Sequence, residues 1–333
     1  MNKTRPNIFS IVPKELVHDG FFTWLLQWAD DSNSQFDQEL SLVAKDWVKF
    51  FIQLKYNIPN IEIKSVRTWR QWEHIDIIAE INNEFAVIIE DKTNSGEHSE
   101  QLERYKEIVN NYYKDSNYKV VFIYLKTGNE SLAALKKVKE KDYFIVDRKS
   151  ILNLFKKGET KNEIFIEFKE YLIEIDNQTD SYNSLENLIS NWKAAEGFYI
   201  TLQERIKEDS DWRYVPNQTG GFLGFWYHWK WEKASEGNLY IQIENAFEYG
   251  IKLVVKIDEW EQDILLLHKI LADLKLISIR YGLALVKPDR YRAGETSTVA
   301  VVENAFPNEN KFDVNEFIIT LKSLEKTIDE YCQ

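Results

Sequence analysis

A cluster of charged residues stands at the end of an apolar run. In "VIIEDKT", residues 87–93, branched apolar residues that favour β-strands lead straight into Glu90, Asp91 and Lys92. Burying such charges without partners is costly, so their position needs a reason. Carboxylate oxygens bind hard divalent cations, and a lysine beside the ion can hold a water or stabilise charge on a phosphate. The cluster therefore fits the cleavage of phosphodiester bonds.

A second acid reaches this cluster if the segments on either side of Asn82 and Asn83 pair as a hairpin. Asn tolerates the left-handed backbone that short hairpin loops need, and loops of two or three residues are both common. A two-residue loop places Asp76 and Glu90 on opposite faces of the sheet. A three-residue loop places Asp76 directly opposite Glu90, with Lys92 on the same face.

We expect the three-residue loop, because it also produces one wholly apolar face. That face collects Ile75, Ile77, Ile81, Phe85, Val87 and Ile89. The other face then carries His74, Asp76, Glu90 and Lys92. Asp91 points its side chain away and offers its carbonyl oxygen as a ligand.

Two facing carboxylates repel each other unless a cation lies between them. Hard ions such as Mg²⁺, for which Mn²⁺ can substitute, prefer oxygen ligands. We expect Asp76, Glu90 and the carbonyl of Asp91 to hold such an ion, with Lys92 beside it. The alternative is an ion-paired sheet edge, or a site that has lost its activity.

At these residues the chain resembles the PD-(D/E)XK nuclease superfamily. Its pattern is an acid on one strand and Glu-x-Lys on the next, here Asp76 and then Glu90 to Lys92, although Ile75 replaces the usual proline. Upstream, "ELVHDGFFTWLL" resembles the opening of a bacterial group of this superfamily, the one known as family 4. Downstream, "EQLERYKEIV" is similar to a helix of the RecB-like branch. The resemblance implies further site residues on these helices, namely Glu15, Gln101 and Tyr105.

The resemblance also implies a fold and an activity. The fold is an α/β restriction-endonuclease-like domain, a mixed central sheet flanked by helices. The activity is Mg²⁺-dependent hydrolysis of nucleic acid, with DNA as the expected substrate, a homodimer as one expected form, and phage defence or mobile-element biology as the setting. The rival interpretation is a catalytically silent module of the same fold that binds nucleic acid or another protein.

The order of elements agrees with such a domain at the N-terminal end. Two helical patterns (14–29 and 35–56) precede three strand-like runs (61–69, 74–81 and 84–92), and helices then alternate with strands up to residue 175. The polar segment 176–184 is the expected linker. We therefore expect two domains, at 1–178 and 184–333. The second, an α+β domain, would recognise substrate, a partner protein or a small-ligand trigger.

Composition limits the partners. The formal net charge of −12 opposes general affinity for a polyanion, but residues 101–150 hold 11 Lys and Arg against 7 Asp and Glu. The stretch 280–292 is also basic. The aromatic strand "GFWYHWKWE" (224–232) would place Trp226, His228 and Lys230 on one face, with core packing as the default reading and base stacking as the alternative.

Location and the other histidines complete the expectations. A single cysteine, Cys332, and the lack of a membrane-spanning or leader-like segment indicate a cytoplasmic protein. His74 and His98 could approach the site, although ordinary structural roles are expected for both. No zinc pattern and no nucleotide-binding glycine loop occurs.

Overall fold

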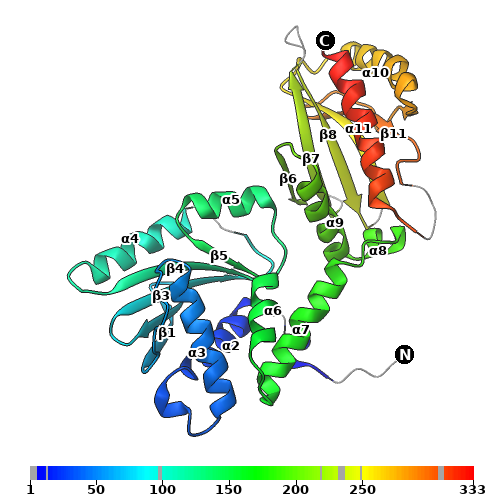
Figure 1. Cartoon of the computed structure of the whole chain (residues 1–333). Helices are drawn as coiled ribbons and strands as arrows, with labels where there is room; N and C mark the ends of the chain where they lie inside the picture. Colours follow the sequence, from blue (N-terminus) through cyan, green and yellow to red (C-terminus); the bar gives the residue numbers. More distant parts are fainter. Residues whose placement is uncertain are drawn as a thin grey trace. The chain divides into compact units, whose positions relative to one another are not determined.

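The computed structural model describes residues 6–12, 14–96, 100–217, 220–231, 237–247, 250–306 and 311–333. The chain divides into two compact units (Figure 1). The first comprises Met1–Glu130 and Ala134–Asn177, and the second comprises Ser131–Ala133 and Gln178–Gln333. Helix α7 (Glu163–Thr179) runs into the segment that we expected to be a linker. Within the described ranges, no helix is long and apolar enough to cross a membrane.

The first unit is built on a mixed five-stranded sheet. Its strands lie in the order β1 (Val66–Trp72), β2 (Ile75–Ile81), β3 (Phe85–Lys92), β4 (Lys119–Lys126) and β5 (Phe144–Asp147). The first three strands are antiparallel and the last three are parallel, joined by α4 (Gln101–Tyr113) and α5 (Leu132–Glu140). Because β3 and β4 are parallel, both end at the same edge of the sheet. The expected mixed sheet flanked by helices is confirmed.

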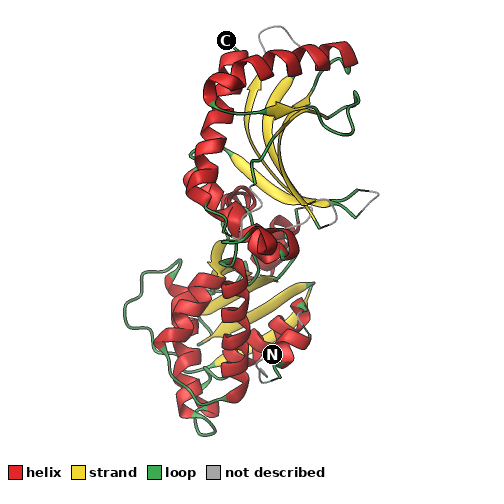
Figure 2. Cartoon of the chain, turned by 90° about the vertical axis from the view of Figure 1, so that its right-hand side faces the viewer, coloured by secondary structure: helices red, strands yellow, loops and turns green. Residues whose placement is uncertain are grey.

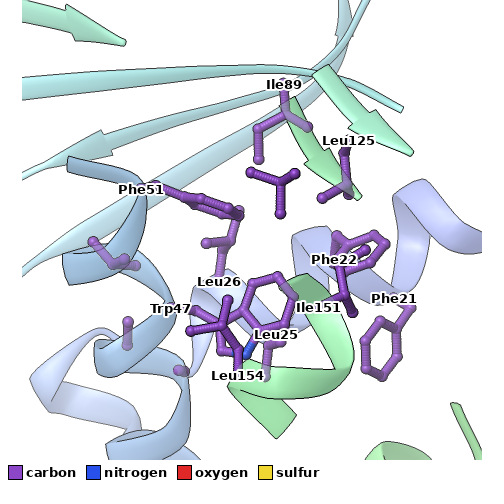
Figure 3. Packing of buried hydrophobic residues seen from close by; sticks show 14 of the residues in the cluster. Phe21, Phe22, Leu25, Leu26, Trp47, Phe51, Ile89, Leu125, Ile151 and Leu154 are labelled. Atoms are coloured by element: carbon purple, nitrogen blue, oxygen red, sulfur yellow. The ribbon is translucent and has the colours of Figure 1, made fainter. Parts of the chain in front are cut away.

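Helices cover both faces of this sheet. On one face lie α1 (Ile8–Ile11), α2 (Glu15–Gln27), α3 (Gln38–Gln53), α6 (Arg148–Lys157) and α7, and the short η1 (Asp31–Asn33) lies between α2 and α3 in the sequence. Their aromatic and aliphatic side chains meet Ile89 and Leu125 of the sheet (Figure 3). On the other face, Leu102, Tyr105 and Val109 of α4 pack on the sheet. The start of β2 and the end of β3 are therefore enclosed between α2 and α4.

The β2–β3 hairpin has the predicted register. Ile81 pairs with Phe85, and Asn82 and Asn83 both adopt left-handed backbone, with φ of 56° and 53°. One detail of the expected apolar face is wrong, because Ile75 packs in the cluster under α4 rather than with Ile77. The turn before β2 is left-handed at Glu73 and His74, so Ile75 does not follow the alternation of the strand.

The second unit is a helix-covered antiparallel sheet, as expected for an α+β unit. Its strand order is β10-β11-β9-β8-β7-β6. The strands are β6 (Ser210–Val215), β7 (Phe222–Trp231), β8 (Asn238–Ala246), β9 (Gly250–Asp258), β10 (Leu285–Val286) and β11 (Ser297–Val302). The helices are α8 (Leu185–Ser190), α9 (Trp192–Arg205), α10 (Ile264–Ser278), η2 (Ile279–Tyr281) and α11 (Val314–Tyr331). Of residues 278–286, most are helical or in turns, and only Leu285–Val286 forms a strand.

The aromatic strand does not alternate as predicted. The pairing of β7 with β8 shifts between Tyr227 and Lys230, and His228 within this bulge has a φ of 61°. An extra residue in a bulge re-aims the side chains that follow it. His228 is consequently buried and contacts Asp329 of α11, whereas Trp226 stays on the opposite face of the sheet beside Arg213.

Candidate metal and catalytic site

Glu90 lies at the centre of a hydrogen-bonded group at the end of β3. Its Oε1 accepts a bond of 2.6 Å from Lys92 Nζ and one of 2.9 Å from Gln101 Nε2. Gln101 also contacts the Tyr105 hydroxyl at 2.8 Å, and that hydroxyl donates to the carbonyl of His74 at 2.7 Å. Gln101 and Tyr105 are one turn apart on α4, so both reach the same end of the sheet. The structure thus brings these predicted residues together.

Asp76 completes the group from β2. Its Oδ2 accepts a hydrogen bond of 2.9 Å from the backbone N–H of Asp91, and its Oδ1 accepts one of 3.1 Å from Gln71. Burial, followed by the nearby Asp76 carboxylate, raises the pKa of Glu90 to about 8. Burial also raises the pKa of Asp76. Both acids are therefore held where their charged forms are disfavoured, as for a pair of carboxylates that lacks a cation.

Asp91 points away from this face, as predicted, and its side chain is fully buried. Neither carboxyl oxygen meets a hydrogen-bond donor among the described residues. Burial, then the charges of Asp19 and Asp76, raise its pKa well above the usual range. The carboxyl of Asp19 lies within hydrogen-bonding reach of the Asp91 carboxyl, and this neighbour favours the protonated form of Asp91.

Asp19 is the acid that sequence reasoning missed. It lies on α2 one turn after Glu15, is 1% exposed, and is within 3.6 Å of Arg70. Burial and then Asp76 raise its pKa to about 7. The available signal was the spacing of four residues from Glu15, which places both acids on one side of the helix.

Glu15 holds the loop that follows β3. Its Oε1 accepts from Thr93 N at 3.1 Å and from the Ser95 hydroxyl at 2.5 Å. Burial disfavours its charge, but the bonds from Ser95 and Thr93 outweigh burial and lower its pKa. Glu15 therefore stays charged and fixes the backbone next to Lys92.

Lys92 is charged and almost enclosed, with 7% of its surface exposed. Burial would lower its pKa, but the neighbouring Glu90 carboxylate raises it overall. A cation held this close to the acid pair can act on a negatively charged group bound beside it.

The histidines have structural positions. His74 contributes its carbonyl to Tyr105, and its own side chain is exposed. His98 lies outside the described residues. His18 Nδ1 lies 3.1 Å from the hydroxyls of both Thr93 and Thr127, which follow β3 and β4.

The donor set suits a divalent cation that prefers oxygen. Glu90 Oε2 is buried and has no hydrogen-bond partner among the described residues, and the facing Asp76 supplies a second carboxylate. An ion there would offset the repulsion that raises the pKa of Glu90. The residues at this edge therefore fit a metal ion.

A different cluster forms in the second unit. Ligand atoms of Glu208, His228 and Glu325 lie within 4.8 Å of one another, and among the described residues they form the only such group of three. Each side chain of this group already has a hydrogen-bond or ion-pair partner. His228 contacts Glu208 at 2.8 Å and Asp329 at 3.1 Å, while Glu325 accepts bonds from Tyr227 and Lys322. The cluster is thus complete without an ion.

Comparison with known proteins identifies the first unit and part of the second. The family model of the PD-(D/E)XK nuclease superfamily matches residues 6–229, which is more than half of the 333-residue chain. Neither the curated proteins nor the solved structures contain a match.

Proposed function

The chain belongs to the PD-(D/E)XK nuclease superfamily, and on that premise we propose that it is a metal-dependent nuclease that hydrolyses phosphodiester bonds. Members of this superfamily are usually nucleases that use divalent metals. The observation that carries the proposal is the contact of Lys92 and Gln101 with the same oxygen of Glu90, opposite Asp76.

We assign the ligands of the ion to Asp76, Glu90 and the carbonyl of Asp91. A bound Mg²⁺ or Mn²⁺ would supply an activated water and offset charge on the scissile phosphate. The residues around these ligands set their positions. Gln101 fixes the rotamer of Glu90, and Tyr105 anchors Gln101 to the backbone of His74. The raised pKa of Asp91 favours its neutral form, which would limit the negative charge behind the ligands.

Lys92 is assigned to the reaction itself. Its ammonium lies beside Glu90, so it can donate a hydrogen bond to the attacking water or to a phosphate oxygen. Glu15 holds the backbone of Thr93 and thereby limits the movement of Lys92. A fixed cation needs no reorganisation when negative charge develops on the phosphate.

The finer assignments rest on the family resemblance. We propose DNA as the substrate, Mg²⁺ as the ion, the cytoplasm as the location, and phage defence or mobile-element biology as the setting. A homodimer would allow both strands of a duplex to be cut, and its mass in solution can be measured directly.

The test is the cleavage of supercoiled and linear plasmid with Mg²⁺ or Mn²⁺. Wild type is compared with Lys92→Ala and Asp76→Ala, and with Lys64→Ala as the control, because Lys64 forms an exposed ion pair with Glu62. We expect metal-dependent cutting that survives only in the wild type and the control. A folded wild type that cuts neither DNA nor RNA would overturn the proposal, and salt-sensitive binding without cleavage would favour a silent binding module.

A further inference from the structure

The second sheet carries helices along one side, and in the described part of the chain no helix covers its other face (Figure 2). Strand register identifies the residues of this helix-free face. Gly224 of β7 lies between Arg213 and Glu244, and Glu244 pairs with Lys252. In the next row, Trp226, Gln242, Val254 and Val301 are neighbours across four strands. Aromatic, polar and charged side chains therefore share this face.

A cavity of about 580 Å³ lies over one end of this face. Phe222, Val254, Val301 and Pro288 supply apolar parts of its lining, and the segment after β10 closes one side. Cavities of this size, mostly apolar with a few polar groups, are typical of sites for small organic ligands.

The cationic side chains of the cavity lining favour the binding of an anion. Lys252, Lys287 and Arg290 all line it. Among the described residues none of the three pairs with a carboxylate, although Lys287 lies 4.7 Å from the centre of the Tyr291 ring. In a protein with a formal net charge of −12, three such cations around one cavity form a local site for negative charge.

Two acids, Glu244 and Asp289, also line the cavity, and Glu244 can orient a bound ligand. Gln242 and Lys256 both donate to its Oε1, at 2.9 and 3.3 Å. Its Oε2 can therefore accept from the amino or imino N–H groups of a ligand. Lys256 balances the charge of Glu244, so the three cations of the lining outnumber the one remaining acid, Asp289.

Gly224 keeps the aromatic surface continuous. A Cβ atom at this position would lie 3.0 Å from both Phe222 and Trp226, which is tighter than ordinary contact. The absence of a side chain lets the two rings lie next to each other along β7. A flat ring can stack on such a surface, as bases do on aromatic platforms.

We propose that this cavity binds a nucleotide. The base stacks on Phe222 and presents N–H donors to Glu244, while Lys252, Lys287 and Arg290 hold the phosphates. A free nucleoside triphosphate and one nucleotide within a single-stranded nucleic acid both offer this chemistry. This site does not depend on the nuclease proposal, because binding is separate from cleavage.

The test measures binding to the full chain with the Lys92→Ala change, which is expected to remove any cleavage. The probes are GTP, guanosine, inorganic triphosphate and a guanine-containing single-stranded DNA of about ten nucleotides. Calorimetry measures the affinity of each probe. We expect GTP or the oligonucleotide to bind more tightly than guanosine and triphosphate. Lys252→Glu and Phe222→Ala should each weaken that binding about ten-fold.

Lys326→Glu is the matched control. It makes the same charge change on an exposed residue of α11, a helix that packs on the opposite face of the sheet, and it should leave binding unchanged. Thermal melting checks the fold of every variant, and Arg290→Glu, on an exposed loop, replaces Lys252→Glu if the latter fails to fold.

Each outcome of the binding experiment either supports or overturns the nucleotide proposal. Binding of GTP identifies a free nucleotide as the source, whereas binding of the oligonucleotide alone identifies a strand. Triphosphate that binds as tightly as GTP, without dependence on Phe222, would show a simple anion site and overturn the proposal. So would the absence of binding by all probes. Cleavage of plasmid by the parent chain is scored separately, so the two proposals fail independently.

Discussion

Gln101 Nε2 donates a hydrogen bond of 2.9 Å to Glu90 Oε1, which ties helix α4 to the end of strand β3. Lys92 donates to the same oxygen from its own strand. The position of Glu90 is thus set by two elements, and the other oxygen of its carboxylate is left for a ligand.

Loss of this bond should slow the reaction without unfolding the protein. We expect Gln101→Ala to lower kcat, or to raise the metal concentration needed, by roughly 10- to 100-fold, the usual effect of removing a residue that orients a ligand. Tyr105→Phe should act more weakly, because it removes only the hydroxyl that fixes Gln101. Plasmid cleavage over a range of Mn²⁺ concentrations measures both. Unchanged kinetics in Gln101→Ala would exclude a positioning role.

A divalent ion should stabilise the protein in the absence of nucleic acid. An ion that binds only the folded state raises Tm, by about 2–4 °C for each kcal/mol in a protein of moderate size. We expect a rise with Mn²⁺ that disappears in Asp76→Asn. Glu208→Gln, in the cluster of the second unit, should leave the shift unchanged. A rise in Tm that persists in Asp76→Asn and disappears in Glu208→Gln would place the ion at His228 instead.

The stability of the metal-free protein should fall as pH rises. The folded-state pKa values of Glu90 and Asp19 are raised, to about 8 and about 7, and that of Asp91 is raised too. Acids with raised pKa values contribute full stability below their unfolded pKa, and this is lost as pH rises through the folded pKa. With a chelator present, the free energy of unfolding should therefore decrease between about pH 4.5 and pH 8.

Urea denaturation at several pH values tests this expectation. Asp91→Asn should raise the free energy of unfolding at pH 8, by an amount on the order of 1 kcal/mol or more, because the amide needs no proton. The same change at the exposed Asp115 should have no effect. A wild type whose stability is flat or increases up to pH 8 contradicts the prediction.

The hairpin loop depends on the side chain of Asn82 as well as on its backbone. Its Oδ1 accepts from the backbone of Lys64 and Ser65, at 2.9 and 3.1 Å, and its Nδ2 donates to the carbonyl of Glu62 at 2.7 Å. Asn82→Gly keeps the left-handed backbone but loses these bonds, at a cost of about 1–3 kcal/mol. Asn83→Gly should change stability by less than about 0.5 kcal/mol. Equal effects in chemical denaturation would show that the backbone alone matters.

Gly128 sets the separation of the segments that follow β3 and β4. A Cβ atom there would lie 1.9 Å from the carbonyl oxygen of Thr93. Gly128→Ala must therefore displace the backbone next to Lys92, and we expect lower Tm together with lower cleavage. Gly20→Ala is the matched control, since the nearest atom in its surroundings, on Arg70, is at 3.9 Å, and this helical change should stabilise by up to about 1 kcal/mol. A Gly128→Ala variant with normal Tm and activity would refute the argument.

The sequence by itself determined the local geometry of the candidate site. Side chains alternate along a strand with a period of two, so a loop of known length fixes which residues face each other. That rule predicted the pairing of Ile81 with Phe85, which the structure shows, and with it the closeness of the Asp76 and Glu90 carboxyls. Helical spacing likewise predicted that Gln101 and Tyr105 share one face of α4.

Only the tertiary structure decided which distant elements meet. The contact of Asp19 with Asp91 depends on how α2 docks against the sheet, and periodicity gives the buried side of a helix but not its partner. The bulge at His228 reversed an alternation that the sequence implied. Lys252 lies on β9, whereas Arg290 follows β10, which is separated from β9 in the sequence by α10 and joins the sheet through β11. That these two cations line one cavity follows from the packing of the whole unit rather than from any local pattern.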